Sequence, residues 1–104
     1  MNKKSREKLR EIRAEYERIS ADLAIVQDKL EDLESSLDFL GSTEQFKLDN
    51  VPENLQNSEA YYDREQATSA LVDVAADAMP ITADCGNLVD SINSLLESID
   101  DVES

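Results

Sequence analysis

Apolar residues recur along the chain at alternating spacings of three and four, in two separate stretches. In the first half they occupy ten positions: Leu9, Ile12, Tyr16, Ile19, Leu23, Val26, Leu30, Leu33, Leu37 and Leu40. Ten more follow in the second half: Leu71, Val74, Ala78, Ile81, Cys85, Leu88, Ile92, Leu95, Ile99 and Val102. A mean repeat of about 3.5 residues places one apolar stripe along a helix and is typical of a coiled coil. The pattern predicts an all-α chain with two long helices.

The two stripes are equally long, and they match when the helices run antiparallel. Pairing residues whose numbers sum to 111 sets Leu23 opposite Leu88 and Leu30 opposite Ile81. This order also places the basic first turns beside the acidic end of the second helix, where charges that oppose the two helix dipoles offset each other. We predict an antiparallel two-helix coiled-coil hairpin, a single domain over residues 1–104, with these twenty positions as its core.

The residues between the stripes predict the bounds of the helices. Gly41 stands where a helix-ending glycine is common, and Ser58 can cap the start of a helix. We predict helix 1 over about 3–40, a long, partly ordered connector over 41–57 and helix 2 over about 58–102. Helix 2 would then extend beyond helix 1. Apolar residues of the connector would cover this extension by packing against its Tyr61, Tyr62 and Ala67: Phe46, Leu48, Val51 and Leu55.

Pro80 lies inside the second stripe, and the stripe keeps its phase across it. Proline removes a backbone hydrogen bond from a helix interior and destabilises it by about 3 kcal/mol. We therefore predict that helix 2 is kinked near Pro80, or broken there into two halves.

Composition limits the chemistry that the chain can perform. It has 24 acidic and 10 basic residues, a net charge of −14, one Cys and no His. These counts exclude an imidazole base and an internal disulfide. No carboxylate occupies a stripe position, and the predicted core has no polar member beyond Tyr16 and Cys85. We expect no enzymatic activity, no catalytic residue, no metal site and no cofactor.

The charge is distributed unevenly, and its distribution bears on partners. Residues 1–18 carry a net charge of +3, the rest of the chain carries −17, and no basic residue follows Arg64. Nucleic-acid binders need an extensive basic face, so direct nucleic-acid binding is not expected. No apolar run reaches the roughly 20 residues of a membrane span, so no membrane partner is expected either. A basic protein is the expected partner.

Two groups of carboxylates are the candidate partner-binding surface. They are Asp73, Asp77 and Asp84 on the second helix, with Asp28, Glu31, Asp32 and Asp38 on the first. Carboxylates one helical turn apart are separated by about 5–6 Å, close to the spacing of phosphates along a nucleic-acid strand. This acidic face is therefore a candidate DNA mimic. The plainer interpretation is the solvated face of an acidic coiled coil.

Further apolar residues flank the stripes and form a candidate patch for a homodimer or a partner protein. They are Ile25, Phe39, Val72, Met79, Val89 and Leu96. On this hypothesis, Leu96→Asp leaves the hairpin folded and converts a dimer to a monomer.

The connector carries a resemblance. The stretch Leu48-Asp-Asn-Val-Pro-Glu-Asn-Leu-Gln-Asn-Ser-Glu-Ala-Tyr61 resembles the connector of a group of small phage and prophage proteins. Those proteins have a basic Met-Asn-Lys start, one helix, a motif like Asp-Asn-(Leu/Ile)-Pro-Glu-(Ser/Asn)-Leu-Gln-x-Ser-Glu, and a second, acidic helix. This chain differs at Ala60, where a basic residue is common, and by Pro80 and Gly86 in its second helix. The group has no assigned site residues, so the resemblance implies only a mobile-element origin and the bacterial host cytoplasm.

Three functions from different classes fit these observations. The first is a phage-encoded inhibitor that binds a host nucleic-acid-handling defence protein, such as a CRISPR effector or a restriction-type nuclease. The second is a structural or assembly coiled coil that acts through self-association. The third is a small-ligand binding protein with a pocket of cationic or aromatic groups, for which the connector and its flank are the only candidate: Phe46, Lys47, Tyr61, Tyr62 and Arg64. The first is our hypothesis, and the second is its alternative.

Overall fold

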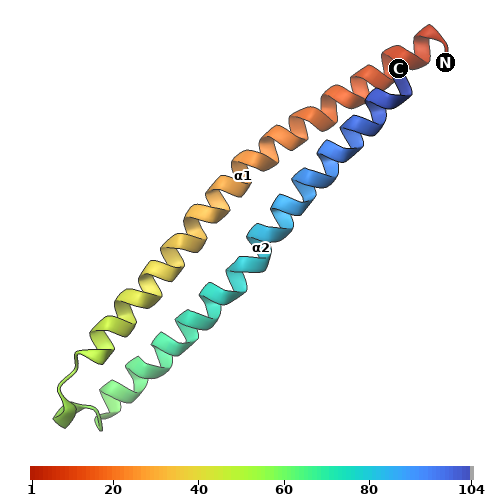
Figure 1. The fold of residues 1–104 in the computed structure, drawn as a ribbon. Helices are drawn as coiled ribbons and strands as arrows, with labels where there is room; N and C mark the ends of the chain where they lie inside the picture. Colours follow the sequence, from red (N-terminus) through yellow and green to blue (C-terminus); the bar gives the residue numbers. More distant parts are fainter. Residues whose placement is uncertain (104) are drawn as a thin grey trace. The chain divides into compact units, whose positions relative to one another are not determined.

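The computed structural model describes residues 1–103 and consists of two long helices that pack against each other (Figure 1). Helix α1 spans Lys3–Asp49 and helix α2 spans Glu59–Glu103. A short 3-10 helix, η1, spans Glu53–Leu55 between them. No strand occurs within residues 1–103. The predicted all-α antiparallel hairpin is confirmed.

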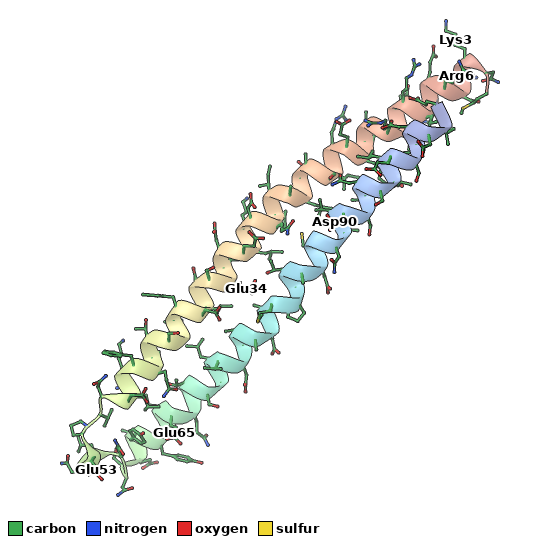
Figure 2. All side chains as sticks on the ribbon, viewed as in Figure 1. Lys3, Arg6, Glu34, Glu53, Glu65 and Asp90 are labelled. Carbon is green, nitrogen blue, oxygen red and sulfur yellow. The ribbon has the colours of Figure 1, made fainter. Side chains whose placement is uncertain are left out.

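The hairpin consists of two compact units along the chain. Unit 1 comprises Met1–Lys29 and Ala83–Ser104, and unit 2 comprises Leu30–Thr82. Unit 1 brings the first turns of α1 beside the last turns of α2, as Figure 1 shows. Unit 2 contains the connector, which carries Glu53 (Figure 2).

Helix α1 does not end at Gly41, as the sequence predicts, but continues to Asp49. The reason is packing. Gly41 is buried against α2, with Val72 in van der Waals reach, and two turns later Leu48 is only 4% exposed. The last turns of α1 thus bury apolar surface that a connector beginning at residue 41 would leave open. They also lie beside the start of α2, so α2 does not extend past α1 by three turns.

Three side chains satisfy backbone groups at the helix ends. Ser5 N–H donates to Asn2 Oδ1 at 2.8 Å, so Asn2 caps the start of α1. Asn50 Nδ2 donates to the carbonyl of Phe46 at 2.7 Å and closes its end. Tyr61 N–H donates to Ser58 Oγ at 3.1 Å, which confirms Ser58 as the cap of α2. Only the third of these caps is predicted from the sequence.

Pro80 lies within α2, and the helix runs through it without a break. The predicted break into two halves is therefore wrong, while the predicted kink stays a prediction. Pro80 is exposed. Because its ring points away from the helix contact, α2 tolerates it at the expense of one backbone hydrogen bond.

We call the face by which α1 and α2 contact each other the seam, and in unit 1 it is rotated relative to the prediction. Ile12, Ile19 and Val26 are each more than a third exposed on α1. On α2, the same holds for Leu88, Leu95 and Val102. The residues that are buried or half-buried in their place lie one position later in the heptad: Arg13, Ser20 and Gln27 on α1, and Val89 and Leu96 on α2.

The seam of unit 2 shows the same rotation. Leu33 and Leu40 on α1 and Val74 and Ile81 on α2 are exposed, contrary to the prediction. The seam uses instead Leu30, Glu34, Leu37, Gly41, Glu44 and Leu48 of α1, with Tyr61, Thr68, Leu71, Ala75, Ala78 and Thr82 of α2. The axial match of the helices is close to the predicted one, because the carbonyl of Leu23 accepts a hydrogen bond from Cys85, one turn before Leu88.

The rotation has a physical reason in the size and polarity of the rows that replace the predicted ones. Gly41 and Ala75 are small, so the two helices approach closely in unit 2. In unit 1, Ser20 Oγ donates to Asn93 Oδ1 at 2.9 Å, and Arg13 reaches Asp100. These interactions form only when this row faces the other helix. Of the twenty predicted core residues, eleven are exposed. Tyr16 is one of them, at 37%, so its prediction as a core residue is wrong. The other ten, five on each helix, are called the outer rows below: Ile12, Ile19, Val26, Leu33 and Leu40, with Val74, Ile81, Leu88, Leu95 and Val102.

Candidate interaction surfaces

The carboxylates predicted to bind a partner are all exposed, and they come from both helices. Asp73, Asp77 and Asp84 belong to α2, and Asp28, Glu31, Asp32 and Asp38 belong to α1. In unit 2, two of them line grooves to which both helices contribute: Asp38 lines one with Val72, and Asp73 lines another with Asp49. That all seven form one acidic face stays a prediction.

A groove in unit 2 adds carboxylates that the sequence analysis did not select. Asp49, Glu65 and Asp73 line it, with Tyr61 and Val72 among the other lining residues. Asp49 comes from the end of α1, and the other two come from the first turns of α2. A groove that combines three carboxylates with apolar side chains such as Val72 can hold a lysine or arginine side chain by both its stem and its charged group. Its signal in the sequence is absent, because it depends on the last turns of α1 beyond Gly41.

A second groove of unit 2 lies beside small residues of the seam. Gly41, Ala75 and Ala76 form its floor, and Leu37 and Val72 form its apolar walls. Phe46 lines this groove too and is 70% exposed, so it does not cover the start of α2 as predicted. Tyr61 is half-buried, and the exposed Tyr62 accepts a hydrogen bond from Gln66 Nε2 at 2.7 Å.

The predicted apolar patch is only partly exposed. Ile25, Phe39, Val72 and Met79 are each at least half exposed. Val89 and Leu96, by contrast, are half-buried in the seam of unit 1. The rotation of α2 turns them inward, so less of their surface is open to a second copy than the sequence predicts, and their role as dimer contacts stays a prediction. Leu96→Asp would place a carboxylate in the seam and destabilise the hairpin itself.

Ion pairs connect the basic first turns of α1 to the acidic end of α2 in unit 1, as predicted. Arg13 donates to both oxygens of Asp100, with Nε–Oδ1 at 2.6 Å and Nη2–Oδ2 at 3.1 Å. Arg10 lies 3.6 Å from Glu103. The hydrogen bonds from Arg13 lower the pKa of Asp100, and charge attraction adds to them against the opposing effect of desolvation. Lys3 and Arg6 lie further along the same end (Figure 2).

Cys85 occupies the seam position that the sequence predicts for it. It is half-buried, and its thiol lies 3.6 Å from the carbonyl oxygen of Leu23. The predicted absence of polar core residues is wrong, however. Ser20, Thr68 and Thr82 are buried and Glu34 and Glu44 are half-buried, because the rotated seam draws on polar rows. Within residues 1–103, every buried side-chain nitrogen or oxygen has a hydrogen-bond partner.

No group of three or more Cys, Asp or Glu side chains within residues 1–103 is arranged to hold a metal ion. Neither helix of this part of the chain contains a stretch apolar enough to cross a membrane.

Comparisons with protein-family models, curated proteins and solved structures found no match to this chain.

Proposed function

We propose that this protein acts without catalysis, by binding a basic surface of another protein through exposed carboxylates. The charge of unit 2 is the observation that supports this function. Unit 2 has twelve acidic and two basic residues. Among its described residues, the one ion pair joins Lys47 to Glu44 at 3.2 Å. Most carboxylates of unit 2 therefore face solvent without a cationic neighbour.

The resemblance of the connector to small phage proteins suggests the class of partner. Proteins that handle nucleic acids hold the phosphate backbone with lysine and arginine side chains. A host defence nuclease or CRISPR effector has such a surface, and an acidic helix that occupies it would block the nucleic acid. We therefore propose inhibition of a nucleic-acid-handling host protein, with mimicry of the phosphate backbone as the mechanism.

The carboxylates of α2 are the better candidates for this contact. Asp73 and Asp77 are one turn apart, or about 5–6 Å, and Asp84 follows seven residues later on the same outward side. Asp73 also lines the groove with Asp49 and Glu65. The α1 carboxylates lie on the other helix, so we expect a basic groove that holds α2 to make fewer contacts with them.

The test compares two charge-neutralised variants of equal size. Asp73→Asn, Asp77→Asn and Asp84→Asn together should weaken the complex roughly 3- to 150-fold in Kd, because each exposed ion pair contributes about 0.2–1 kcal/mol. Asp28→Asn, Asp32→Asn and Asp38→Asn together form the matched control and should bind as wild type does. Affinity capture from bacterial lysate at two salt concentrations, read by mass spectrometry, identifies the partner. Titration of that partner then gives the Kd values.

The expected partner is a basic nucleic-acid-binding protein whose capture declines as salt rises, because salt screens exposed charges. A captured protein that the α2 variant binds as tightly as wild type does would rule out mimicry by these residues. Equal losses from both triple variants would show a general effect of net charge.

The outer rows favour a second candidate function, an assembly coiled coil. Ten large apolar side chains at heptad spacing are more than a solvated hairpin needs, and coiled coils associate through such rows. Self-association is compatible with the first function, since the carboxylates of α2 do not belong to the outer rows.

A further inference from the structure

We propose that a second copy of this chain covers the outer rows, so that two hairpins form a four-helix bundle. The inference deepens the second candidate function, self-association, and rests on it, but it does not depend on the first. It concerns the apolar residues that the rotated seam leaves exposed, whereas the first candidate function concerns carboxylates on other positions.

The pattern of the outer rows is the first argument. All ten residues are large and uncharged, and each is between 39% and 61% exposed. In each helix they recur every seven residues, from Ile12 to Leu40 and from Val74 to Val102. Scattered exposed leucines are normal on a protein surface, but an unbroken heptad row is the pattern of a helix that packs against another helix.

The outer rows of the two helices lie on the same side of the hairpin within each unit. On both helices, each outer row lies one residue before a row of the seam: Ile19 precedes Ser20 on α1, and Leu88 precedes Val89 on α2. Because the helices are antiparallel, this equal displacement places both rows on one face. Unit 1 presents three residues from each helix, and unit 2 presents two from each. Each unit therefore has a flat apolar face two helices wide.

The interior of the hairpin is the second argument, because it is too small to stabilise a chain of this length. Among the described residues, the buried apolar side chains are Leu48, Ala75, Ile92 and Ile99, and no large side chain is fully buried. Folded domains near 100 residues normally bury enough apolar surface to offset conformational entropy by a few kcal/mol. Covering the outer rows would add ten large apolar side chains to this interior.

The total area that the chain exposes also favours a second copy as the partner of the outer rows. The chain exposes 7698 Å², whereas a folded monomer of 11.6 kDa exposes about 5,800 Å². The surplus is about 1,900 Å² per chain. Two copies that each bury it would form an interface of about 3,800 Å² in total, within the range of stable homodimers.

A twofold-related copy offers the matching surface. Such an interface uses the same patch on both partners, so the patch must complement itself. The outer rows meet this condition, because they carry no charge and have the same heptad period on both helices. The rows of one copy can pack between those of the other, as in four-helix bundles. Asp77 and Asp84 are three or four residues from Val74, Ile81 and Leu88, so these carboxylates would border the interface.

Sedimentation equilibrium of the full chain tests the proposal with two neighbouring substitutions. Val26→Glu places a charge in an outer row, and Ile25→Glu is the matched control on the preceding residue, which is turned away from the seam. Ile25 belongs to the apolar patch predicted from the sequence, so a dimer that formed through that patch would be lost with Ile25→Glu instead. We expect a wild-type mass of twice 11.6 kDa, a dimer weakened at least about 100-fold by Val26→Glu and an unchanged dimer with Ile25→Glu. Circular dichroism of each variant reports whether the helices persist.

Salt gives a second readout that separates this proposal from the proposed function. Each copy carries −14, so screening should tighten the dimer, whereas it should weaken a complex with a basic partner. Loss of both helix and dimer with Val26→Glu alone would support the proposal, because an uncovered surface site does not control folding. A helical wild-type monomer at about 100 μM would overturn it and point to a foreign partner for the face. A dimer that survives Val26→Glu, or equal losses from both variants, would also overturn it.

Discussion

The side-chain amide of Gln27 lies against the backbone of Gly86 in the seam of unit 1. A Cβ atom added to Gly86 would lie 2.8 Å from Gln27 Nε2 and 3.4 Å from Gln27 Cδ. Gly86 therefore makes room for Gln27, a long polar side chain in a seam row where a coiled coil usually has leucine. Gly41 in unit 2 differs, because a Cβ atom there would meet Val72 Cγ2 at an ordinary 3.9 Å.

Replacement of Gly41 by alanine should stabilise the protein. Gly41 lies inside α1 with a normal helical backbone, and alanine is favoured over glycine in a helix interior by about 1 kcal/mol. The added methyl group fits against Val72. We expect the free energy of unfolding in urea to rise by about 0.5–1 kcal/mol. A decrease would show that Gly41 ends the helix in solution, as its sequence context suggests.

Gly86→Ala should stabilise the protein less than Gly41→Ala does. The gain in helix propensity is the same, but the amide of Gln27 must move away. It can do so, because it is the far end of a flexible side chain. We expect a change between 0 and about 1 kcal/mol in the same urea experiment. In the Gln27→Ala background the full gain should return, and a destabilised Gly86→Ala protein in that background would contradict the assigned contact.

The Arg13–Asp100 pair should make stability depend on pH in the acid range. The folded-state pKa of Asp100 lies below its ordinary value of 3.8, mainly because of the hydrogen bonds from Arg13. The carboxylate therefore adds stability that is fully present above pH 3.8 and is lost as the pH falls through its folded-state pKa. Wild type and Asp100→Asn should differ in unfolding free energy at neutral pH and converge in strong acid.

An NMR titration checks the same interaction directly. Arg13→Gln should raise the pKa of Asp100 toward 3.8, because the guanidinium is the main cause of the shift. Arg18→Gln is the control, since Arg18 pairs with Glu15 on its own helix. An Asp100 pKa that Arg13→Gln leaves unchanged would show that the pair does not persist in solution.

Ser58→Ala should destabilise the start of α2. Ser58 Oγ accepts from the backbone N–H of Tyr61 and donates to the carbonyl of Leu55. Loss of a serine N-cap costs about 1 kcal/mol. Ser91→Ala is a suitable control, because Ser91 Oγ bonds only to the carbonyl of Asn87 one turn back, where alanine is a good substitute. Thermal unfolding should show a lower midpoint temperature for Ser58→Ala and an unchanged midpoint temperature for Ser91→Ala.

Pro80→Ala should stabilise α2 by up to about 3 kcal/mol, since it restores a backbone N–H to the helix interior. The proline side chain is exposed, so little packing is lost. Hydrogen exchange should show stronger protection around residues 76–84. Unchanged protection would mean that the helix already accommodates the proline without loss.

Periodicity predicted the two helices, their antiparallel order and their axial match, because a heptad stripe is a property of the chain itself. It did not predict the rotation of the helices. The apolar surface of each helix is wider than one seam, and hydrophobicity alone favours its largest members, such as Ile19 and Leu88. The structure instead turns Ser20 and Gly41 inward. Small and polar residues at heptad spacing are the signal that could have shown this.

The candidate surfaces were predictable to different degrees. Asp73, Asp77 and Asp84 were placed on the outside of α2, because charged residues outside a stripe rarely become buried. The groove with Asp49 and Glu65 was not found, since it requires α1 to continue past Gly41. The sequence pattern does not determine how each helix is rotated about its axis. It therefore predicts Val89 and Leu96 in an exposed patch and the outer rows in the core, and the structure reverses both.

The hydrogen bond between Ser20 and Asn93 distinguishes one alignment of the helices from its neighbours. Sliding α2 by one heptad along α1 would keep apolar rows in contact, yet it would set Ser20 level with Gly86 or Asp100 and separate Arg13 from its carboxylate. A hairpin with repeating apolar residues can adopt several such shifted states, because each of them still buries most of the apolar surface between the helices. Each shifted state would leave the buried hydroxyl of Ser20 without Asn93, so this one part-buried hydrogen bond disfavours sliding of the helices.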